Sequence, residues 1–291
     1  SGLDGLEPTY KMIKYSKNIA ISNKESILCA WNLISVELRK YKTKFIPVDS
    51  EHFTIWYSLN NKIRAKAKKI FLTASGGPFL NLKNKHKSNF TVSKALKHPN
   101  WKMGNKITID SATMMNKVFE VIEAKNIFNL EYKDLSILTH PKSYIHSIIF
   151  FENGLIDIIG HDTDMKIPII NSLKFGENCS IKTNGLNLKL LNNLNLNYIN
   201  QKQFPVIKII KMIPNHSSLF ETVIVSVNDA LVELFLNKKI KFTEISEKLL
   251  KIINLKELTA FKRVRPKKIE EIKELSHYVN LKTKEIMYKA L

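Results

Sequence analysis

The sequence predicts an α/β fold followed by a small all-α C-terminal region. Strand and helix patterns alternate over the first 48 residues, which indicates a βαβ unit with parallel strands. Short apolar runs bounded by turn residues recur between residues 135 and 159 and indicate further strands. After residue 219, apolar residues recur at helical spacing without strand signals. The 291 residues suffice for about two domains with a sizeable core.

The N-terminal elements follow from local signals. Pro8 suits the first turn of a helix expected to continue over residues 10–17. A buried strand is expected at 18–22, a helix at 25–42 and a second strand at 45–48. Because the two strands flank one helix, they are expected to pair in parallel.

The next segment combines a strand, a glycine turn and a long polar stretch. The strand at 69–73 leads directly into Gly76 and Gly77, two of only nine glycines, where a sharp turn or a close approach to a ligand is expected. Residues 81–105 are polar and lysine-rich and are expected to form a surface loop, and loops of this length often act as lids. A helix is then expected to begin with Asp110 or Ser111 as its N-cap.

The remaining elements are three strands, a linker and helices. Strands are expected at 135–139, 145–151 and 154–159 as an antiparallel set, with Asn153 and Gly154 forming a hairpin turn. The stretch 178–204 is rich in asparagine and leucine and is expected to be a linker. The periodic segment that follows predicts a small helical domain.

Composition limits the class of function. The net charge of +20 raises the possibility of a nucleic-acid-binding protein, but only four of the 46 basic residues are arginines, and arginine dominates contacts to bases. We therefore expect a solvated lysine-rich surface and no nucleic-acid partner. No apolar run reaches the roughly 20 residues of a membrane span, so no membrane partner is expected. Cys29 and Cys179 lie far apart without metal-ligand spacing, which fits a reducing, cytoplasmic setting.

Three carboxylates form a candidate metal site. Asp49 and Glu51 follow the strand at 45–48, where side chains at the carboxyl end of a parallel strand often meet a ligand. Glu120 lies on the helix that follows Ser111. Three carboxylates are a common oxygen-ligand set for Mg²⁺ or Mn²⁺. The alternative is an acidic turn that only caps the next helix.

A second group of side chains is suited to phosphate. Asn116, Lys117 and Glu120 share one helix face, and Ser111 lies near the start of that helix. Ser75 adjoins the glycine pair, whose backbone N–H groups are further donors. Hydroxyl and amide donors with one point charge can bind a phosphorylated ligand. The alternatives are a solvated helix surface and an ordinary glycine turn.

Two histidines and a tryptophan are further candidates. His98 and Trp101 lie on the expected lid, where Trp101 would cover a ligand and exclude water. A loop tryptophan that only anchors packing is the alternative. His146 lies in an expected apolar strand and is either a site residue or a core histidine with satisfied hydrogen bonds.

Taken together, these motifs resemble the 1-deoxy-D-xylulose 5-phosphate reductoisomerase family. Seven segments occur in the family's order within about 150 residues: G-L-E-P-T at Gly5, N-K-E-S at Asn23, P-V-D-S-E-H at Pro47, L-T-A-S-G-G-P-F at Leu72, H-P-N-W-K-M-G at His98, I-D-S-A-T-M-M-N-K at Ile109 and H-P-K-S-Y-I-H-S at His140. The match is weak beyond residue 178, apart from V-N-D-A at Val227 and the helical ending.

The resemblance implies roles for individual residues. Asp49, Glu51 and Glu120 would ligate Mg²⁺ or Mn²⁺. Substrate contacts would come from Lys24, Ser50, Glu51, Ser75, His98, Ser111, Asn116, Lys117 and Glu120. Catalytic groups would be Lys24, Glu51, His98, Trp101 and His146. NADPH would contact Asn23, Glu25, Gly104 and Met165.

The resemblance also implies an activity and a domain plan. The reaction would be the NADPH-dependent isomerisation and reduction of 1-deoxy-D-xylulose 5-phosphate to 2-C-methyl-D-erythritol 4-phosphate, in a homodimer. Residues 1–46 would be the end of a Rossmann-like NADPH-binding domain, 47–177 an α+β catalytic domain, 178–204 a linker and 205–291 the helical domain. We therefore expect a fragment that does not oxidise NADPH by itself. The alternative is a non-catalytic binding or regulatory module derived from the enzyme.

Overall fold

The computed structural model describes residues 2–60, 66–80, 90–174, 177 and 180–289. Its first elements are the short helices η1 (Gly2–Gly5), α1 (Leu6–Met12) and η2 (Ile13–Tyr15). The first α-helix therefore begins at Leu6, earlier than expected, with Pro8 in its first turn. Leu6 and Ile13 are fully buried, so their packing fixes this segment against the core.

The predicted βαβ unit is present. Strands β1 (Asn18–Ile21) and β2 (Lys44–Pro47) pair in parallel on either side of α2 (Lys24–Tyr41). Asn23 is the N-cap of α2, because its side-chain oxygen accepts the backbone N–H of Ser26 at 2.9 Å. The expectation of a fully buried first strand is wrong, because only Ile21 of β1 is buried and the two-stranded sheet leaves the rest partly open.

A five-stranded sheet forms the second layer, in the order β6-β5-β3-β4-β7. Its strands are β3 (Ala67–Ala74), β4 (Leu135–Thr139), β5 (Ile145–Phe151), β6 (Ile156–Gly160) and β7 (Asn197–Tyr198). The predicted β5–β6 hairpin is antiparallel and turns at Gly154, where φ is +86°. The expectation that β4 belongs to the same antiparallel set is wrong, because β3 lies between β4 and β5 and pairs in parallel with β4.

The glycine pair after β3 makes a sharp turn that packs against a helix. Gly76 and Gly77 have φ values of +81° and +65°, a region that glycine adopts without strain. A Cβ atom at Gly77 would lie 2.8 Å from the Cα of Ala112. The close approach expected here is therefore made to the backbone of α5 (Asn105–Thr113), which places Ser75 beside that helix.

The helix around Ser111 differs from the prediction. An N-cap at Asp110 or Ser111 is wrong, because α5 already begins at Asn105 after Gly104. Met114 adopts a left-handed conformation with φ +70° and separates α5 from α6 (Met115–Ile127). Asp110 therefore lies inside α5, where its carboxylate accepts a hydrogen bond from Asn228 at 2.8 Å.

The lid and linker regions contain more structure than expected. Residues 81–89 of the proposed lid lie outside the described residues, and so does Cys179. The rest of that stretch includes one helical turn, α4 (Val92–Ala95). The linker includes α8 (Leu188–Leu191) and β7, and β7 adds to the sheet beside β4. The assignment of 178–204 as a linker stays a prediction, and these two short elements lie within the segment.

The C-terminal part is helical, as predicted. Its elements are η5 (Pro205–Lys211), α9 (Phe220–Leu236), α10 (Phe242–Ile253), α11 (Lys256–Thr259), η6 (Ala260–Arg263) and α12 (Ile269–Tyr288). Three further helices pack near the sheet: α3 (Ser50–Asn60), η4 (Tyr132–Asp134) and α7 (Lys166–Leu173). The domain boundaries remain predictions, because buried side chains from all parts form one cluster.

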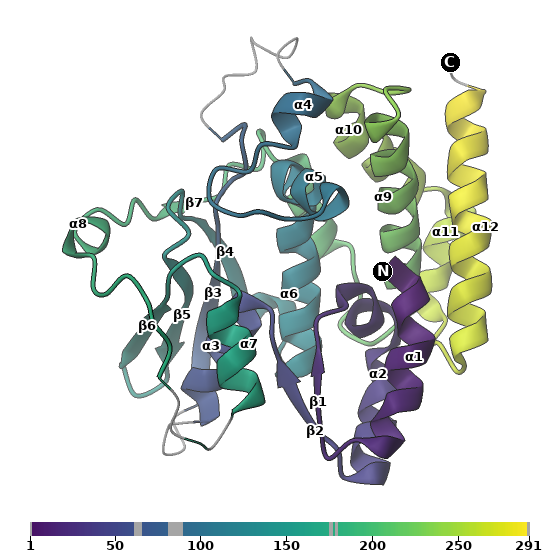
Figure 1. The fold of residues 1–291 in the computed structure, drawn as a ribbon. Helices are drawn as coiled ribbons and strands as arrows, with labels where there is room; N and C mark the ends of the chain where they lie inside the picture. Colours follow the sequence, from purple (N-terminus) through teal and green to yellow (C-terminus); the bar gives the residue numbers. More distant parts are fainter. Residues whose placement is uncertain (1, 61–65, 81–89, 175–176, 178–179, 290–291) are drawn as a thin grey trace.

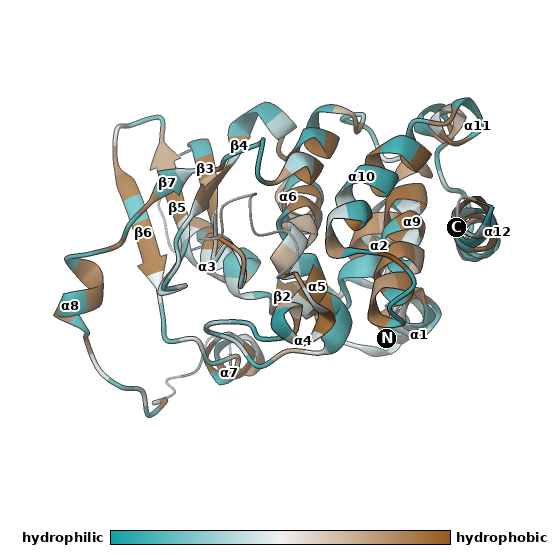
Figure 2. Cartoon of the chain, turned by 90° about the horizontal axis from the view of Figure 1, so that it is seen from above, coloured by the Kyte–Doolittle hydropathy of each residue, from teal (hydrophilic) through white to brown (hydrophobic). Residues whose placement is uncertain are grey.

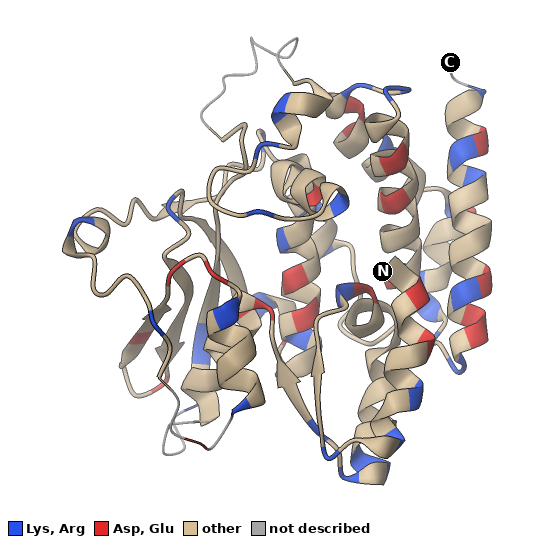
Figure 3. Ribbon diagram, in the orientation of Figure 1, with Lys and Arg blue, Asp and Glu red and all other residues tan. Residues whose placement is uncertain are grey.

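Helix α6 occupies the middle of the molecule. Figure 1 shows it between the five-stranded sheet and the helices α9 and α12, and Figure 2 shows the same order from above. Lysines and arginines are spread over many elements instead of gathering on one face (Figure 3). Among the described residues, no helix is both long and apolar enough to cross a membrane. Because α6 is central, even its charged residues Lys117, Glu120 and Glu123 are buried.

Candidate metal and phosphate site

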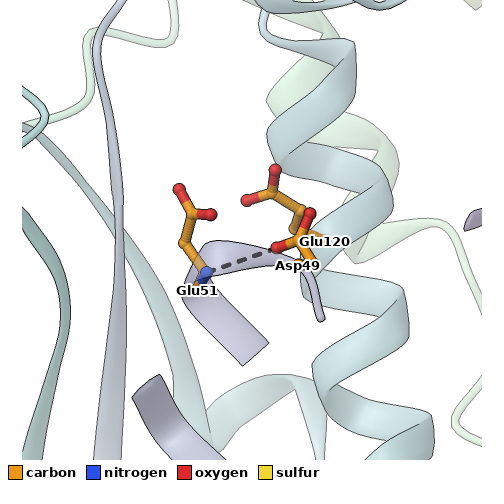
Figure 4. Close-up of side chains that lie close together, drawn as sticks. All are labelled: Asp49, Glu51 and Glu120. Atoms are coloured by element: carbon orange, nitrogen blue, oxygen red, sulfur yellow. Dashed lines mark hydrogen bonds between the residues drawn. The ribbon is translucent and has the colours of Figure 1, made fainter. Parts of the chain in front are cut away.

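Two elements bring the three predicted carboxylates together. Asp49 lies between β2 and α3, Glu51 lies in the first turn of α3, and Glu120 lies on α6 (Figure 4). One oxygen of each lies within 4.8 Å of the others. Ligands on opposite sides of a Mg²⁺ ion with bonds of 2.0–2.1 Å lie about 4.2 Å apart, so small side-chain movements suffice for coordination. The donor set therefore fits a hard divalent cation.

The alternative interpretation of the acidic turn also holds. The backbone N–H of Glu51 donates to the carboxylate of Asp49 at 3.3 Å, and the N–H of Phe53 donates to the Asp49 carbonyl at 2.8 Å. Asp49 thus caps α3 through one carboxylate oxygen, while its other oxygen accepts from the Nζ of Lys24. Capping and convergence of carboxylates are compatible because a carboxylate has two acceptor oxygens.

Two lysine ammonium groups lie between the carboxylates. The Nζ of Lys117 lies 2.6 Å from Glu51 and also contacts Glu120. The Nζ of Lys24 contacts Asp49 and lies 3.6 Å from Glu120. Burial and the nearby Glu51 carboxylate raise the pKa of Glu120 to about 7, although Lys117 opposes this shift. The lysine ammonium groups therefore compensate the negative charge of the carboxylates, and a divalent metal ion can take over this role.

Two buried residues support this cluster and received no role from the sequence. Glu123 lies 3.2 Å from the Nζ of Lys24. The Nε2–H of His52 donates to the carbonyl of Glu120 at 2.9 Å, and its Nδ1 lies 3.3 Å from Asp49. Burial lowers the pKa of His52, but the charges of Glu123 and Asp49 prevail and raise it to about 9. Spacing offered a signal for both, since each lies three residues after a carboxylate ligand candidate on a helix.

The predicted phosphate-binding residues divide into two groups. Ser75 and Ser111 meet at one histidine, whose Nε2 lies 2.9 Å and 3.1 Å from their hydroxyl oxygens. Asn116 donates instead to Glu120 at 2.5 Å, and Lys117 contacts the carboxylates. The hydroxyl pair and the metal carboxylates therefore occupy different sides of the same pocket.

That histidine, His98, is neutral and has a defined tautomer. Its Nδ1 accepts the backbone N–H groups of Asn100 and Trp101 at 3.2 and 2.9 Å, so the ring proton resides on Nε2. Burial lowers the pKa of His98 to about 4. The Nε2–H is thus a fixed donor between the two serine hydroxyls, beside the position expected for a phosphate.

The depressed pKa of His98 predicts a pH-dependent stability. The unfolded chain binds more protons than the folded chain between about pH 4 and 6.5, so the free energy of unfolding falls as pH falls through that window. We expect His98→Asn to remove about 1 to 2 kcal/mol of this loss, because solvent reaches part of the ring and reduces the effect of burial. Urea denaturation of both chains at about pH 4.5 and 7 measures the difference. Equal losses in the two chains would contradict the assignment.

The aromatic candidates line the same pocket. Trp101 lies 6.1 Å from His146 between ring centroids. His146 stacks on His161 at 3.9 Å, and its Nε2–H donates to the carbonyl of His161 at 3.3 Å. Burial, followed by the neighbouring His161, lowers the pKa of His146 to about 3. His146 is therefore a neutral, well-packed strand residue that also borders the pocket.

One pocket of about 230 Å³ gathers all the predicted metal, substrate and catalytic residues. Its lining includes Lys24, Asp49, Ser50, Glu51, Ser75, His98, Trp101, Ser111, Asn116, Lys117, Glu120 and His146, together with Met165. Residues far apart in the sequence therefore share one cavity, which is lined by both the carboxylates and the hydroxyl donors.

The other predicted NADPH contacts line an adjacent pocket of about 300 Å³ that shares Lys24 and Asn116 with the first. Asn23, Glu25 and Gly104 all border it. The side chains of Asn23 and Glu25 are already engaged, because Asn23 donates to the Gly2 carbonyl at 2.8 Å and Glu25 pairs with Lys106 at 3.1 Å. No atom of the described residues lies within 4 Å of a Cβ built at Gly104, so among these residues the backbone there is open to a ligand.

Comparisons with known proteins place the chain next to one enzyme family. The model of the 1-deoxy-D-xylulose 5-phosphate reductoisomerase C-terminal domain matches residues 45–128, and the model of the DXP reductoisomerase C-terminal domain matches 161–281. The 1-deoxy-D-xylulose 5-phosphate reductoisomerase of Pelagibacter ubique is 59% identical over 282 residues, which are 97% of this chain and 73% of that protein. The Aquifex aeolicus protein of the same name is 36% identical, over 98% of this chain and 73% of its own length.

Solved structures give the same result. The reductoisomerase of Zymomonas mobilis in complex with NADPH has a TM-score of 0.86 and 29% identity, over 98% of this chain and 73% of that one. A DOX-P reductoisomerase in complex with NADPH, fosmidomycin and magnesium has a TM-score of 0.86 and 30% identity, over 99% and 73%. The likeness extends over nearly the whole chain, including the segment beyond residue 178 where motifs were sparse.

Proposed function

The chain belongs to the 1-deoxy-D-xylulose 5-phosphate reductoisomerase family, and on that premise we propose that its main pocket binds the phosphorylated sugar and a divalent metal. The family's reaction is the NADPH-dependent conversion of 1-deoxy-D-xylulose 5-phosphate to 2-C-methyl-D-erythritol 4-phosphate in non-mevalonate isoprenoid biosynthesis. The observation that carries the proposal is the convergence of three carboxylates and a serine–histidine–serine cluster in one cavity. The alternative of a non-catalytic module is less favoured. A protein that only binds a ligand does not require a set of metal-binding carboxylates and a phosphate-binding cluster in the same cavity.

Each side of the pocket has a proposed task. Asp49, Glu51 and Glu120 would hold Mg²⁺ or Mn²⁺, and such an ion would supply Lewis-acid stabilisation of the charge that develops during rearrangement. The hydroxyls of Ser75 and Ser111 and the Nε2–H of His98 bind the phosphate, and Asn116 joins them by giving up its present hydrogen bond to Glu120. The substrate is then held at its phosphate end and at its metal-binding end. Holding both ends orients the carbon skeleton for the rearrangement.

The remaining residues position the substrate and shield it. Lys24 supplies an ammonium beside Asp49, and Ser50 donates to the Glu51 carboxylate at 2.6 Å, so both order the metal side. Trp101, His146 and Met165 give the pocket apolar and neutral walls that exclude water. Asn23, Glu25 and Gly104 of the adjacent pocket, together with Met165, would hold NADPH, which would supply the hydride.

A calorimetric titration tests the proposed function. Fosmidomycin is expected to bind the 291-residue chain only when Mn²⁺ is present, because the phosphonate and the metal side each supply part of the site. The matched control is the same titration with EDTA in place of Mn²⁺. A chain that is folded by circular dichroism and binds neither ligand would refute the proposal.

We also propose that the chain forms a homodimer in the cytoplasm, where the buried thiol of Cys29 stays reduced. One face of the sheet supports this. Ile156 and Ile158 on β6 are 59% and 52% exposed, and they pair with Phe150 and Ile148 of β5 on a partly exposed face. Figure 2 shows β6 as a largely hydrophobic strand. An apolar sheet face of this kind is typical of an interface between copies.

The dimer is expected to dissociate when charge is placed on that face. Ile158→Lys should shift the chain to monomers, because a buried ammonium at an apolar interface has no partner. Val36→Lys on α2 is a matched control, since Val36 is 48% exposed and lies away from the sheet. Sedimentation velocity measures both. An unmodified chain that is monomeric at all concentrations would contradict the dimer.

A further inference from the structure

Helix α5 carries Ser111 to the phosphate side of the pocket, and its position depends on packing from both sides. On one side the turn at Gly77 contacts Ala112, so the helix cannot move towards the sheet. At the C-terminal end of α5, Met114 adopts a left-handed conformation and interrupts the helix. Because α5 and α6 are not one continuous helix, α6 does not fix the orientation of α5. The contacts on the remaining side must therefore fix the helix.

Those contacts come from α9 in the helical C-terminal part. The side-chain amide of Asn228 donates to Asp110 at 2.8 Å, and both side chains are almost fully buried. The Nζ of Lys106 lies 3.0 Å from Asp229 of α9 and 3.2 Å from Asp110 one turn further along α5. Two consecutive residues of α9 therefore bind two successive turns of α5, one through a hydrogen bond and one through an ion pair.

The same cluster reaches the first part of the chain. Lys106 also lies 3.1 Å from Glu25 at the start of α2, next to Lys24 of the metal side. Burial lowers the pKa of Lys106, but the carboxylates of Asp110, Asp229 and Glu25 prevail and raise it, so the ammonium stays charged. One ammonium here faces three carboxylates, so the loss of Asp229 leaves Lys106 paired with Asp110 and Glu25 but removes the ion pair that ties α9 to α5.

We infer that Asn228 and Asp229 are positioning residues for phosphate binding, which act through Asp110 and Lys106 to set Ser111 against His98. This inference rests on the proposed function, because it assigns the phosphate to the Ser75–Ser111 side. The serine hydroxyls need hydrogen-bond distances to their ligand, so a displacement of α5 by a few tenths of an ångström weakens them. The metal carboxylates lie on α3 and α6 and are not moved by the same change.

The test compares ligands that bind opposite sides of the pocket. Asp229→Asn in the 291-residue chain is expected to weaken fosmidomycin binding in saturating Mn²⁺ about tenfold, and to change Mn²⁺ affinity less than about twofold. Amide hydrogen exchange within Asn105–Thr113 is expected to accelerate. Asp229→Glu, which keeps the ion pair, should restore most of the affinity.

Glu233→Gln serves as the control, and Asn228→Ala is a second variant of the same contact. Glu233→Gln removes an ion pair with Lys284 one turn along α9, at 2.8 Å, and should leave both affinities and α5 exchange unchanged. Asn228→Ala should repeat the effect of Asp229→Asn if the latter folds poorly. Unchanged fosmidomycin affinity in a folded Asp229→Asn chain, or equal losses for both ligands, would overturn the inference. If the unmodified chain binds no fosmidomycin, the proposed function fails, and the exchange data alone decide whether α9 holds α5.

Discussion

Replacing Glu120 by glutamine is expected to weaken Mn²⁺ binding at least about 100-fold, because residues that only support a metal ligand already account for 10–100-fold. Glutamine keeps the shape and the hydrogen bond from Asn116 but removes the charge, and it leaves Asp49 and Glu51 as the remaining carboxylates of the trio. Isothermal titration with Mn²⁺ measures the change. Fosmidomycin binding in Mn²⁺ should weaken as well, since it depends on the metal.

Glu123→Gln is the matched control for this prediction. Glu123 lies three residues further along α6, is equally buried and contacts Lys24, but it is outside the trio of converging carboxylates. We expect its loss to weaken Mn²⁺ binding about tenfold, at the lower end of the range for a supporting residue. Similar losses in the two variants would show that net charge, and not coordination by Glu120, governs the affinity.

Local signals predicted the elements that depend on local chemistry. Helix α2 has a polar N-cap and a long amphipathic run, and its predicted bounds differ from the observed ones by one residue at each end. Strands β4 and β5 are bounded by turn residues and have the predicted ends. The break at Met114 had no such signal, because a left-handed residue is usually glycine or asparagine and here tertiary packing imposes it on methionine.

Local sequence patterns could not predict which strands pair with each other. The insertion of β3 between β4 and β5, and the addition of β7 to the edge, depend on which surfaces meet in three dimensions. The same limit applies to the site. The candidate metal carboxylates followed from motifs, but the contacts of Lys117 with Glu51 and of Asn228 with Asp110 join residues 66 and 118 positions apart. Sequence spacing carries no information about such contacts.

Lys117→Met is expected to reduce the free energy of unfolding by about 3 to 5 kcal/mol in the absence of metal. The Lys117 side chain is 5% exposed and contacts both Glu51 and Glu120. Without it, two buried carboxylates face each other, and Glu120 escapes the repulsion only by binding a proton. Its folded pKa is already raised to about 7 and rises further, so the chain loses stability as pH rises through that value. Urea denaturation should therefore show a larger loss at about pH 8 than at about pH 6.

Mn²⁺ is expected to reverse this loss, because it supplies the positive charge that the lysine provided. Saturating Mn²⁺ should raise the melting temperature of Lys117→Met more than that of the unmodified chain, in which the metal competes with the ammonium for the same oxygens. Lys125→Met on the same helix is the control, since the Nζ of Lys125 lies over the Tyr132 ring, away from the carboxylate trio. If Mn²⁺ stabilises the Lys117 variant no more than the control, the ammonium and the metal do not share a site.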